Sequence, residues 1–315
     1  MKLSQLISQY IAFKKSLGEV VRTNGYALRA FGRAMGEEVD IRDVQADRVN
    51  AFLSGTGPVT SAWHRKHSCL SSFYRYAIAH GHVACSPLPT VLPKQPARFA
   101  PYIYNREELR RLLDATDSYG SARAFIEPHT FRTLLLLLCG TGLRISEALS
   151  LTLNDVDLTD AVLMVRETKF YKTRLVPVGP QLQRVLIQYA RRRAEARHSQ
   201  SGSAPFFVTR RSAPLTVALV QSSFQRLRTN AGVRRDDSAR YQPRLHDFRH
   251  TFAVHRLIAE YRENKNVQKL LPQLSTYLGH ARISSTQWYL TMTPELLNEA
   301  SLRFEHYAFQ EVRDE

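Results

Sequence analysis

The sequence predicts a mostly helical fold with one small β-sheet or hairpin, divided into an all-helical N-terminal domain and a mixed α/β domain. Three observations support this division. Apolar residues recur at helical spacing near the N-terminus, a proline-rich stretch follows, and two short β-rich runs lie further along. A chain of 315 residues is long enough for two domains that each bury a core. With 43% hydrophobic and 23% charged residues, the composition is that of a globular protein.

The N-terminal domain is predicted from three helical segments. The first begins the chain, the second runs from about Tyr26 to Met35, and the longest is Ser61 to Ala79. The first and the longest each place large apolar residues on one side. These residues are Leu3, Leu6, Ile7, Tyr10 and Ile11 in the first, and Trp63, Leu70, Phe73, Tyr74 and Ala77 in the longest.

The linker is predicted at Ser86 to Pro101, which holds five prolines. Proline ends helices and favours extended backbone, so a run of this kind separates domains. We therefore expect a helical domain at residues 1–88, a linker at 89–103, a second domain at 104–300 and a C-terminal tail at 301–315.

The second domain is expected to surround a hairpin with helices. The β-rich runs Val162–Arg166 and Thr173–Val178 predict the hairpin, with Lys169 near its turn. The segment after Ser199 is predicted to be a mobile loop. Helices are predicted from Asn105 to Asp114, from Phe131 to Cys139 with an end at Gly140 and Gly142, around Leu182 to Arg197, and with interruptions to the C-terminus.

The charge points to a polyanionic partner. Lys and Arg number 44 against 28 Asp and Glu, which gives a formal net charge of +16 and a pI near 10.0. Up to residue 100 there are 13 basic and 6 acidic side chains, so both parts of the chain are basic. Nucleic acid is the leading candidate. A basic protein without such a partner would have the same charge, so charge alone does not show that the protein binds nucleic acid.

The remaining composition indicates a cytoplasmic protein without a membrane partner. Cys69, Cys85 and Cys139 are odd in number, lack CxxC spacing, and are predicted to be reduced core residues. The N-terminus alternates polar and apolar residues, unlike a secretion signal. Every apolar run is shorter than the roughly 20 residues that span a bilayer.

Four short segments carry the reactive residue types: TGLRISEAL, ETKFYKTRLVPV, LHDFRHTFA and LGHARISSTQWYL. Their order and internal spacing resemble the tyrosine recombinase or phage integrase family, which includes Xer-type, Cre-type and lambda-type integrases. The resemblance covers about two thirds of the chain. It places the family's catalytic residues at Arg144, Lys169, His246, Arg249, His280 and Tyr289.

The resemblance implies a function as well as a fold. The N-terminal domain would be a SAM-like core-binding domain and the second a catalytic domain, together clamping double-stranded DNA at a specific recombination site. The protein would act without a cofactor or a metal, as a homo-tetramer on paired sites, with related recombinases or accessory proteins as further possible partners. It would then be a nucleoid-associated bacterial protein, and the owner is expected to be a mobile element.

The chemistry of these residue types fits attack on a phosphodiester. Arg144 and Arg249 would bind the phosphate, because guanidinium stays charged and presents a planar fork. Tyr289 would be the nucleophile, although its phenol, with an ordinary pKa of about 10, needs help to lose a proton. Lys169 would protonate the leaving 5′ oxygen. Taken singly, each arginine is equally a surface residue, and Tyr289 equally a core aromatic beside Trp288.

Further residues are assigned by position. His246 and His280 would contact phosphate or shuttle protons, and Glu147, three residues after Arg144, would orient a catalytic side chain or only solvate its turn. Lys169 is preferred over Lys172 because counting back from RLVPV matches the family. His250 and His255 are expected to pack or cap within the helix that follows. DNA contacts outside the catalytic centre are expected from Arg65, Lys66, Lys172 and Arg174.

Three other functions compete with this prediction. A type IB topoisomerase uses the same chemistry, a catalytically silent accessory factor would keep the fold, and a metal-dependent nuclease would need a carboxylate cluster. The motifs depart from the family at Leu-Thr-Met after Tyr289 and at KFYK in the hairpin, where relatives often carry glycine. The last segment, Leu297 to Val312, would dock on a neighbouring subunit or pack on its own domain.

Overall fold

The chain forms two compact units, one comprising Met1–Phe99 and the other formed mainly by the residues from Ala100 onward. Each is described by itself. The computed structural model describes residues 1–19, 21–57, 59–96, 100–119, 124–168, 172–237, 239, 241–263, 266–279, 283–291, 296–299 and 301–302.

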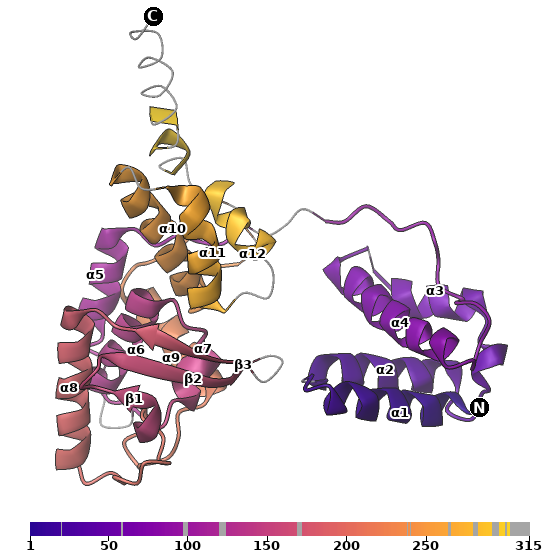
Figure 1. The fold of residues 1–315 in the computed structure, drawn as a ribbon, viewed down its shortest axis with the longest axis horizontal. Coiled ribbons are helices and arrows are strands. Elements are labelled where there is room, and N and C mark those ends of the chain that lie inside the picture. The colour runs from indigo at the N-terminus through magenta and orange to yellow at the C-terminus, as the bar shows by residue number, and fades with distance from the viewer. Residues whose placement is uncertain are drawn as a thin grey trace, which may run out of the picture. The chain divides into compact units, whose positions relative to one another are not determined.

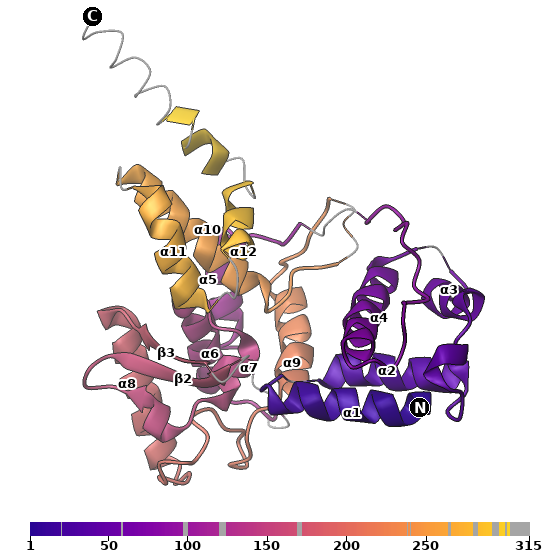
Figure 2. The same cartoon turned by 45° about the vertical axis from the view of Figure 1, so that its right-hand side comes forward.

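The first unit is all helical, as predicted. Four helices, α1 (Leu3–Ser16), α2 (Arg22–Met35), α3 (Ala46–Ser54) and α4 (Ser61–Ala79), pack on one another around a single core, with a 3₁₀ turn at Ile41–Asp43. Figures 1 and 2 both show α1 and α2 side by side. The predicted bounds of α4 are confirmed. The helix starts where it does because the Thr60 hydroxyl oxygen caps the first turn by accepting a hydrogen bond from the backbone N–H of Ala62.

The second unit wraps helices around a three-stranded sheet of order β1-β2-β3, in which β1 pairs antiparallel with β2. The predicted hairpin strands are therefore present, and the fold is mostly helical with one small sheet. Its elements are α5 (Arg106–Ala115), α6 (Pro128–Thr141), α7 (Ile145–Ser150), a 3₁₀ turn (Leu153–Asp155), β1 (Val156–Asp157), β2 (Val162–Thr168), β3 (Lys172–Pro177), α8 (Pro180–Glu195), α9 (Val217–Asn230), α10 (Asp247–Arg262), α11 (Val267–Leu278), α12 (Ser284–Gln287) and η3 (Trp288–Thr291).

Helix α6 is longer than the sequence suggested. It starts at Pro128, since proline suits the first turn, and it ends at Thr141, directly before Gly142, whose φ of +61° is left-handed. The expectation that Gly140 ends this helix is wrong. Gly140 lies inside α6, where a Cβ atom would come within 3.0 Å of Leu182 on α8, so glycine permits close packing of the two helices.

Two clusters of apolar residues form the core of this unit. The larger includes the leucines of α6, the sheet and α8, and the smaller lies between α10, α11 and η3 and includes Tyr289. Helix α10 packs on α6 and on α11, so it lies between the two clusters. Figure 1 shows α10, α11 and α12 grouped together on one side of the sheet-bearing part of the unit.

The structure differs from two smaller expectations, one about the cysteines and one about the segment after Ser199. Cys69 is buried and Cys139 half-buried, but Cys85 is exposed, so it is not a core residue, and none of the three is in a disulfide. The segment after Ser199, expected to be a mobile loop, is anchored: Arg193 donates to the carbonyl oxygens of Ser199 and Pro205 at 2.5 and 3.0 Å. Among the described residues, no helix has the length and apolar character that crossing a bilayer requires.

Candidate active site

A buried carboxylate begins the site at the N-terminus of α7. The backbone N–H of Arg144 donates to Glu147 Oε2 at 3.0 Å, and Arg144 Nη1 donates to Oε1 at 2.7 Å. The Glu147 side chain is 8% exposed, whereas that of Arg144 is 37% exposed. Arg144 is therefore fixed by Glu147 while part of its guanidinium faces solvent.

The same carboxylate is held from the sheet by Arg174 of β3. Arg174 Nη2 and Nη1 donate to Glu147 Oε2 and Oε1 at 2.7 and 3.2 Å, and the Arg174 side chain is 12% exposed. Burial alone would raise the pKa of Glu147. Hydrogen bonds and charge from Arg174, and then from Arg144, outweigh that effect and hold the pKa below its ordinary value. Glu147 is thus ionised at neutral pH.

Arg249, on the first turn of α10, lies deeper. Its guanidinium is 2% exposed and donates to the carbonyl oxygens of Gly142 and Leu278 at 2.9 and 2.6 Å. Burial and the nearby positive charge of Arg144 lower the pKa of Arg249 to about 10, so it remains charged at neutral pH. The site therefore gathers three arginines around one carboxylate.

Tyr289 completes this group from η3. It is 2% exposed within the smaller apolar cluster, and burial raises the pKa of its phenol. The charge of Arg249, a hydrogen bond with its side chain, and the charge of Arg144 act in the opposite direction. Tyr289 is thus both a core aromatic and a neighbour of the arginines, whereas Trp288 beside it is exposed.

Two histidines at the start of α10, the N-cap residue His246 and His250 on the first turn, lie near the tyrosine. The rings of His246 and His250 are 4.9 Å apart, and the rings of His250 and Tyr289 are 5.6 Å apart. Burial lowers the pKa of His246 most, and the positive charge of Arg249 lowers it further. The neutral form of His246 is therefore favoured at pH 7. His250 was expected only to pack or cap. Its position four residues after His246 is the signal that places it on the same helix face.

The other predicted residues fall in different places. Lys169 and His280 lie outside the described residues, as do the side chain of Lys172 and most of the segment expected to dock on a neighbour. Arg65 is exposed. Lys66 donates to the Phe52 carbonyl oxygen at 2.7 Å and lies 4.5 Å from the Phe52 ring centroid, so it fixes α4 on α3.

Arg174 was expected to contact DNA, and in the structure its side chain pairs with Glu147 and so lies inside the site. Strand alternation could have shown this, because Arg174 is two residues before the buried Val176 and so shares its inward face.

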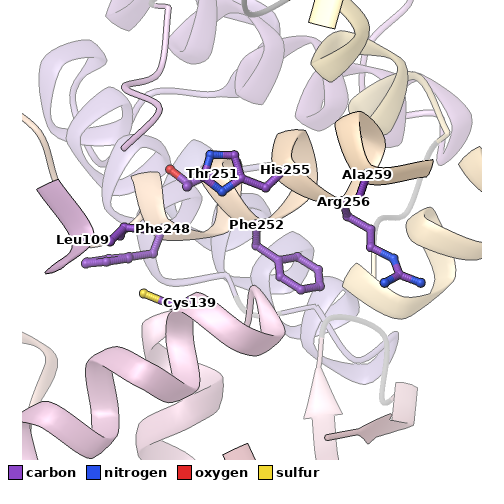
Figure 3. A pocket seen from close by; sticks show the side chains of 8 residues that line it. All are labelled: Leu109, Cys139, Phe248, Thr251, Phe252, His255, Arg256 and Ala259. Carbon is purple, nitrogen blue, oxygen red and sulfur yellow. The ribbon is translucent and has the colours of Figure 1, made fainter. Parts of the chain in front are cut away.

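A different face of α10 carries a separate cavity of about 260 Å³. Figure 3 shows Cys139 of α6 and Leu109 of α5 near Phe248 of α10, and the cavity is also lined by Phe252 and His255. None of the predicted catalytic residues that the structure describes, Arg144, His246, Arg249 and Tyr289, lines it. The hollow next to the site is another one, of about 600 Å³, lined by His246, Ile145 and polar side chains of α9 and of the segment before α10.

Comparison with known proteins identifies the family. Residues 104–295, more than half of the chain, match the phage integrase family. The chain belongs to this family. The chain is 35% identical over 304 residues to the Sinorhizobium fredii protein y4rB, whose name describes an integrase/recombinase, with 96% of each chain covered. It is 30% identical over 324 residues to the tyrosine recombinase XerC of Bacillus pumilus, with 98% of each covered. The chain is therefore a site-specific recombinase of the tyrosine type, and the predicted resemblance is confirmed.

Solved structures show the same fold. A Tn1549 transposon integrase in complex with transposon right end DNA superposes with a TM-score of 0.72 at 17% identity, covering 98% of this chain and 100% of that chain. A lambda integrase tetramer bound to a Holliday junction superposes with a TM-score of 0.66 at 18% identity, covering 92% and 77%. The predicted mostly helical recombinase fold is confirmed.

Proposed function

We propose that this recombinase cleaves and rejoins double-stranded DNA through a covalent 3′-phosphotyrosyl link to Tyr289, in the integration, excision or transposition of a mobile element. The observation that supports this most directly is the position of the Tyr289 phenol beside the Arg249 guanidinium, in a cluster of three arginines and one carboxylate. An excess of fixed positive charge next to an oxygen nucleophile suits attack on a phosphodiester.

The reaction follows from this arrangement. The Tyr289 oxygen forms a bond to phosphorus as the bond to the 5′ oxygen breaks, and negative charge grows on the non-bridging oxygens. Arg144, which is partly exposed, and Arg249 stabilise that charge. Tyr289 gives up its proton more readily as positive charge gathers near it. His280 and His246 contact the phosphate or move protons, and Lys169 protonates the leaving oxygen.

Religation reverses these steps. A 5′ hydroxyl attacks the phosphotyrosyl bond, and the tyrosine oxygen leaves and recovers a proton. The covalent link conserves the energy of the broken phosphodiester, so no ATP is required, and the arginines supply the positive charge that a metal ion would otherwise provide. Relatives support the partner and the assembly: the Tn1549 integrase and the lambda integrase named above were solved with DNA, the latter as a tetramer. We infer that this chain also acts as a tetramer on paired sites.

The test uses DNA from the flanks of its own gene, with a nick beside the cleavage position so that the leaving fragment diffuses away. Wild type should accumulate a protein–DNA adduct that survives denaturation, and Tyr289→Phe should form none. Tyr189→Phe is the matched control, because Tyr189 is equally buried but belongs to the larger apolar cluster. An adduct formed by Tyr289→Phe would show that another residue is the nucleophile.

The same assay separates the competing functions. We expect adduct formation to continue in excess chelator, whereas loss of cleavage that magnesium restores would indicate a metal-dependent nuclease. Relaxation of any supercoiled plasmid, without exchange between two sites, would indicate a topoisomerase. Binding without an adduct would indicate a silent accessory factor.

A further inference from the structure

Three arginines bind three consecutive carbonyl groups at the end of α11. Arg174 Nε donates to the Tyr277 oxygen at 3.0 Å, Arg249 Nη2 to the Leu278 oxygen at 2.6 Å, and Arg144 Nη2 to the Gly279 oxygen at 3.4 Å. The last carbonyls of a helix lack intrahelical donors and carry partial negative charge. Side chains from β3, α10 and the start of α7 therefore fix the residues that directly precede His280.

Arg174 differs from the other two in how its donors are used. All three of its side-chain nitrogens donate within the protein: Nη1 and Nη2 to Glu147, and Nε to Tyr277. Arg144 in contrast is about three times more exposed. The geometry of Arg174 is that of a residue that binds other parts of the site, because its fork is already occupied by a carboxylate.

Gly279 shows how closely the backbone approaches this guanidinium. A Cβ atom at Gly279 would lie 2.8 Å from Arg174 Nη1 and 3.0 Å from Cζ. The φ of Gly279 is also +68°, in the left-handed region that glycine adopts without strain. Both observations require glycine here, so the turn after α11 is built directly against Arg174.

We propose that Arg174 is a positioning residue for strand cleavage, acting through Glu147 on Arg144 and through Tyr277 on the turn that precedes His280. Arg174 shares the Glu147 carboxylate with Arg144 and so leaves Arg144 only partly neutralised. Without Arg174, Glu147 pairs with Arg144 alone and draws it from the phosphate, and the end of α11 loses one of its three side-chain donors. This role rests on the proposed function, since it assumes that Arg144 binds the scissile phosphate.

The test compares full-length variants on the nicked DNA, measuring the maximal rate of adduct formation and the DNA concentration that gives half of it. Arg174→Ala should lower the maximal rate by about 10- to 100-fold, as loss of an outer partner of a site does. The half-saturating concentration should change less than about threefold, because in this role Arg174 acts through contacts with the protein. Arg174→Lys should recover part of the rate, since lysine restores the charge but not the fork.

Two further variants establish the route and the control. If Arg174 acts through Glu147, the double variant Arg174→Ala, Glu147→Gln should be little slower than the slower single variant. Arg166→Ala is the matched control: Arg166 lies on the adjacent strand and also pairs with a buried carboxylate, that of Asp155, outside the site. It should cleave at the wild-type rate.

The outcomes separate this role from the proposed function. A wild-type protein that forms no adduct through Tyr289 refutes the proposed function before any variant is compared. If wild type cleaves, an unchanged maximal rate in Arg174→Ala refutes the positioning role. So does a loss that lies mainly in DNA affinity, which would make Arg174 a DNA contact. If Arg174→Ala does not fold, Arg174→Lys decides, and a wild-type rate in that variant refutes the role.

Discussion

Two buried arginines in the second unit, Arg193 and Arg249, have nearly the same immediate contacts and different surroundings. Each is 2% exposed, and each donates from two nitrogens to two backbone carbonyl oxygens. Within the described residues, neither forms a salt bridge with a carboxylate. Burial lowers the pKa of both. Judged by their hydrogen bonds to the backbone alone, the two guanidinium groups perform the same task.

Their charged neighbours separate them. Among the described residues, no neighbouring cation contributes to the lowered pKa of Arg193, and this side chain ties α8 to the segment between Ser199 and Pro205. Arg249 lies close enough to Arg144 and Arg174 for their charges to lower its pKa further. Like charges held together destabilise the folded protein until an anion arrives. Arg193 therefore serves the scaffold, whereas the positive charge gathered around Arg249 is the setting that the proposed phosphate binding requires.

The largest predicted effect compares the same substitution at both positions. Arg249→Lys keeps the charge but loses the planar fork, so adduct formation should slow by about 10²–10³-fold, the loss expected for one donor to a developing oxyanion. Arg193→Lys should leave the single-turnover rate unchanged at temperatures where the protein is folded. Equal losses in both variants would mean that Arg249, too, serves only the scaffold.

The next predicted effect is on stability, and here the substitution of Arg193 should cost more than the substitution of Arg249. Arg193→Met removes the donors to the Ser199 and Pro205 carbonyls, which should lower the free energy of unfolding by roughly 2 kcal/mol. Arg249→Met also leaves two carbonyls without donors, but it relieves the repulsion from Arg144, so its loss should be smaller. Urea denaturation of both variants measures this. A larger loss for Arg249→Met would contradict the repulsion that the comparison assumes.

The sequence was informative wherever a residue's local pattern determines its structure. The helix at Ser61–Ala79 is marked by its apolar face and by Thr60 as a cap, and both bounds were predicted. The end of α6 was misplaced because Gly140 and Gly142 look alike in sequence. Only the first packs against α8, and only the second takes a left-handed φ. That difference depends on the neighbouring helix, which no local pattern contains.

The site shows the same limit. Family spacing predicted Arg144, Arg249, His246 and Tyr289, which the structure brings together from three helical elements. It did not single out Arg174, which was expected only as a DNA contact, because in a chain with 44 basic residues an arginine on a strand resembles any DNA contact. Its partner Glu147 lies 27 residues away, and the carbonyl at Tyr277 103 residues away. Contacts of that kind form only when the chain has folded.

The smallest predicted effect uses His246 to report the charge of its neighbours. Desolvation and then the charge of Arg249 lower its pKa, so the ring takes up a proton at a lower pH in the folded protein than in the unfolded chain. His246 therefore favours the folded state above its unfolded pKa of about 6.5, and this contribution is lost as the pH falls below that value.

Removing the Arg249 charge makes protonation of His246 easier. NMR titration of the labelled histidine rings should accordingly show a higher His246 pKa in Arg249→Met than in wild type, and no change in Arg193→Met. If both variants left the His246 pKa unchanged, the positive field attributed to Arg249 would be absent, and the two buried arginines would be electrostatically alike.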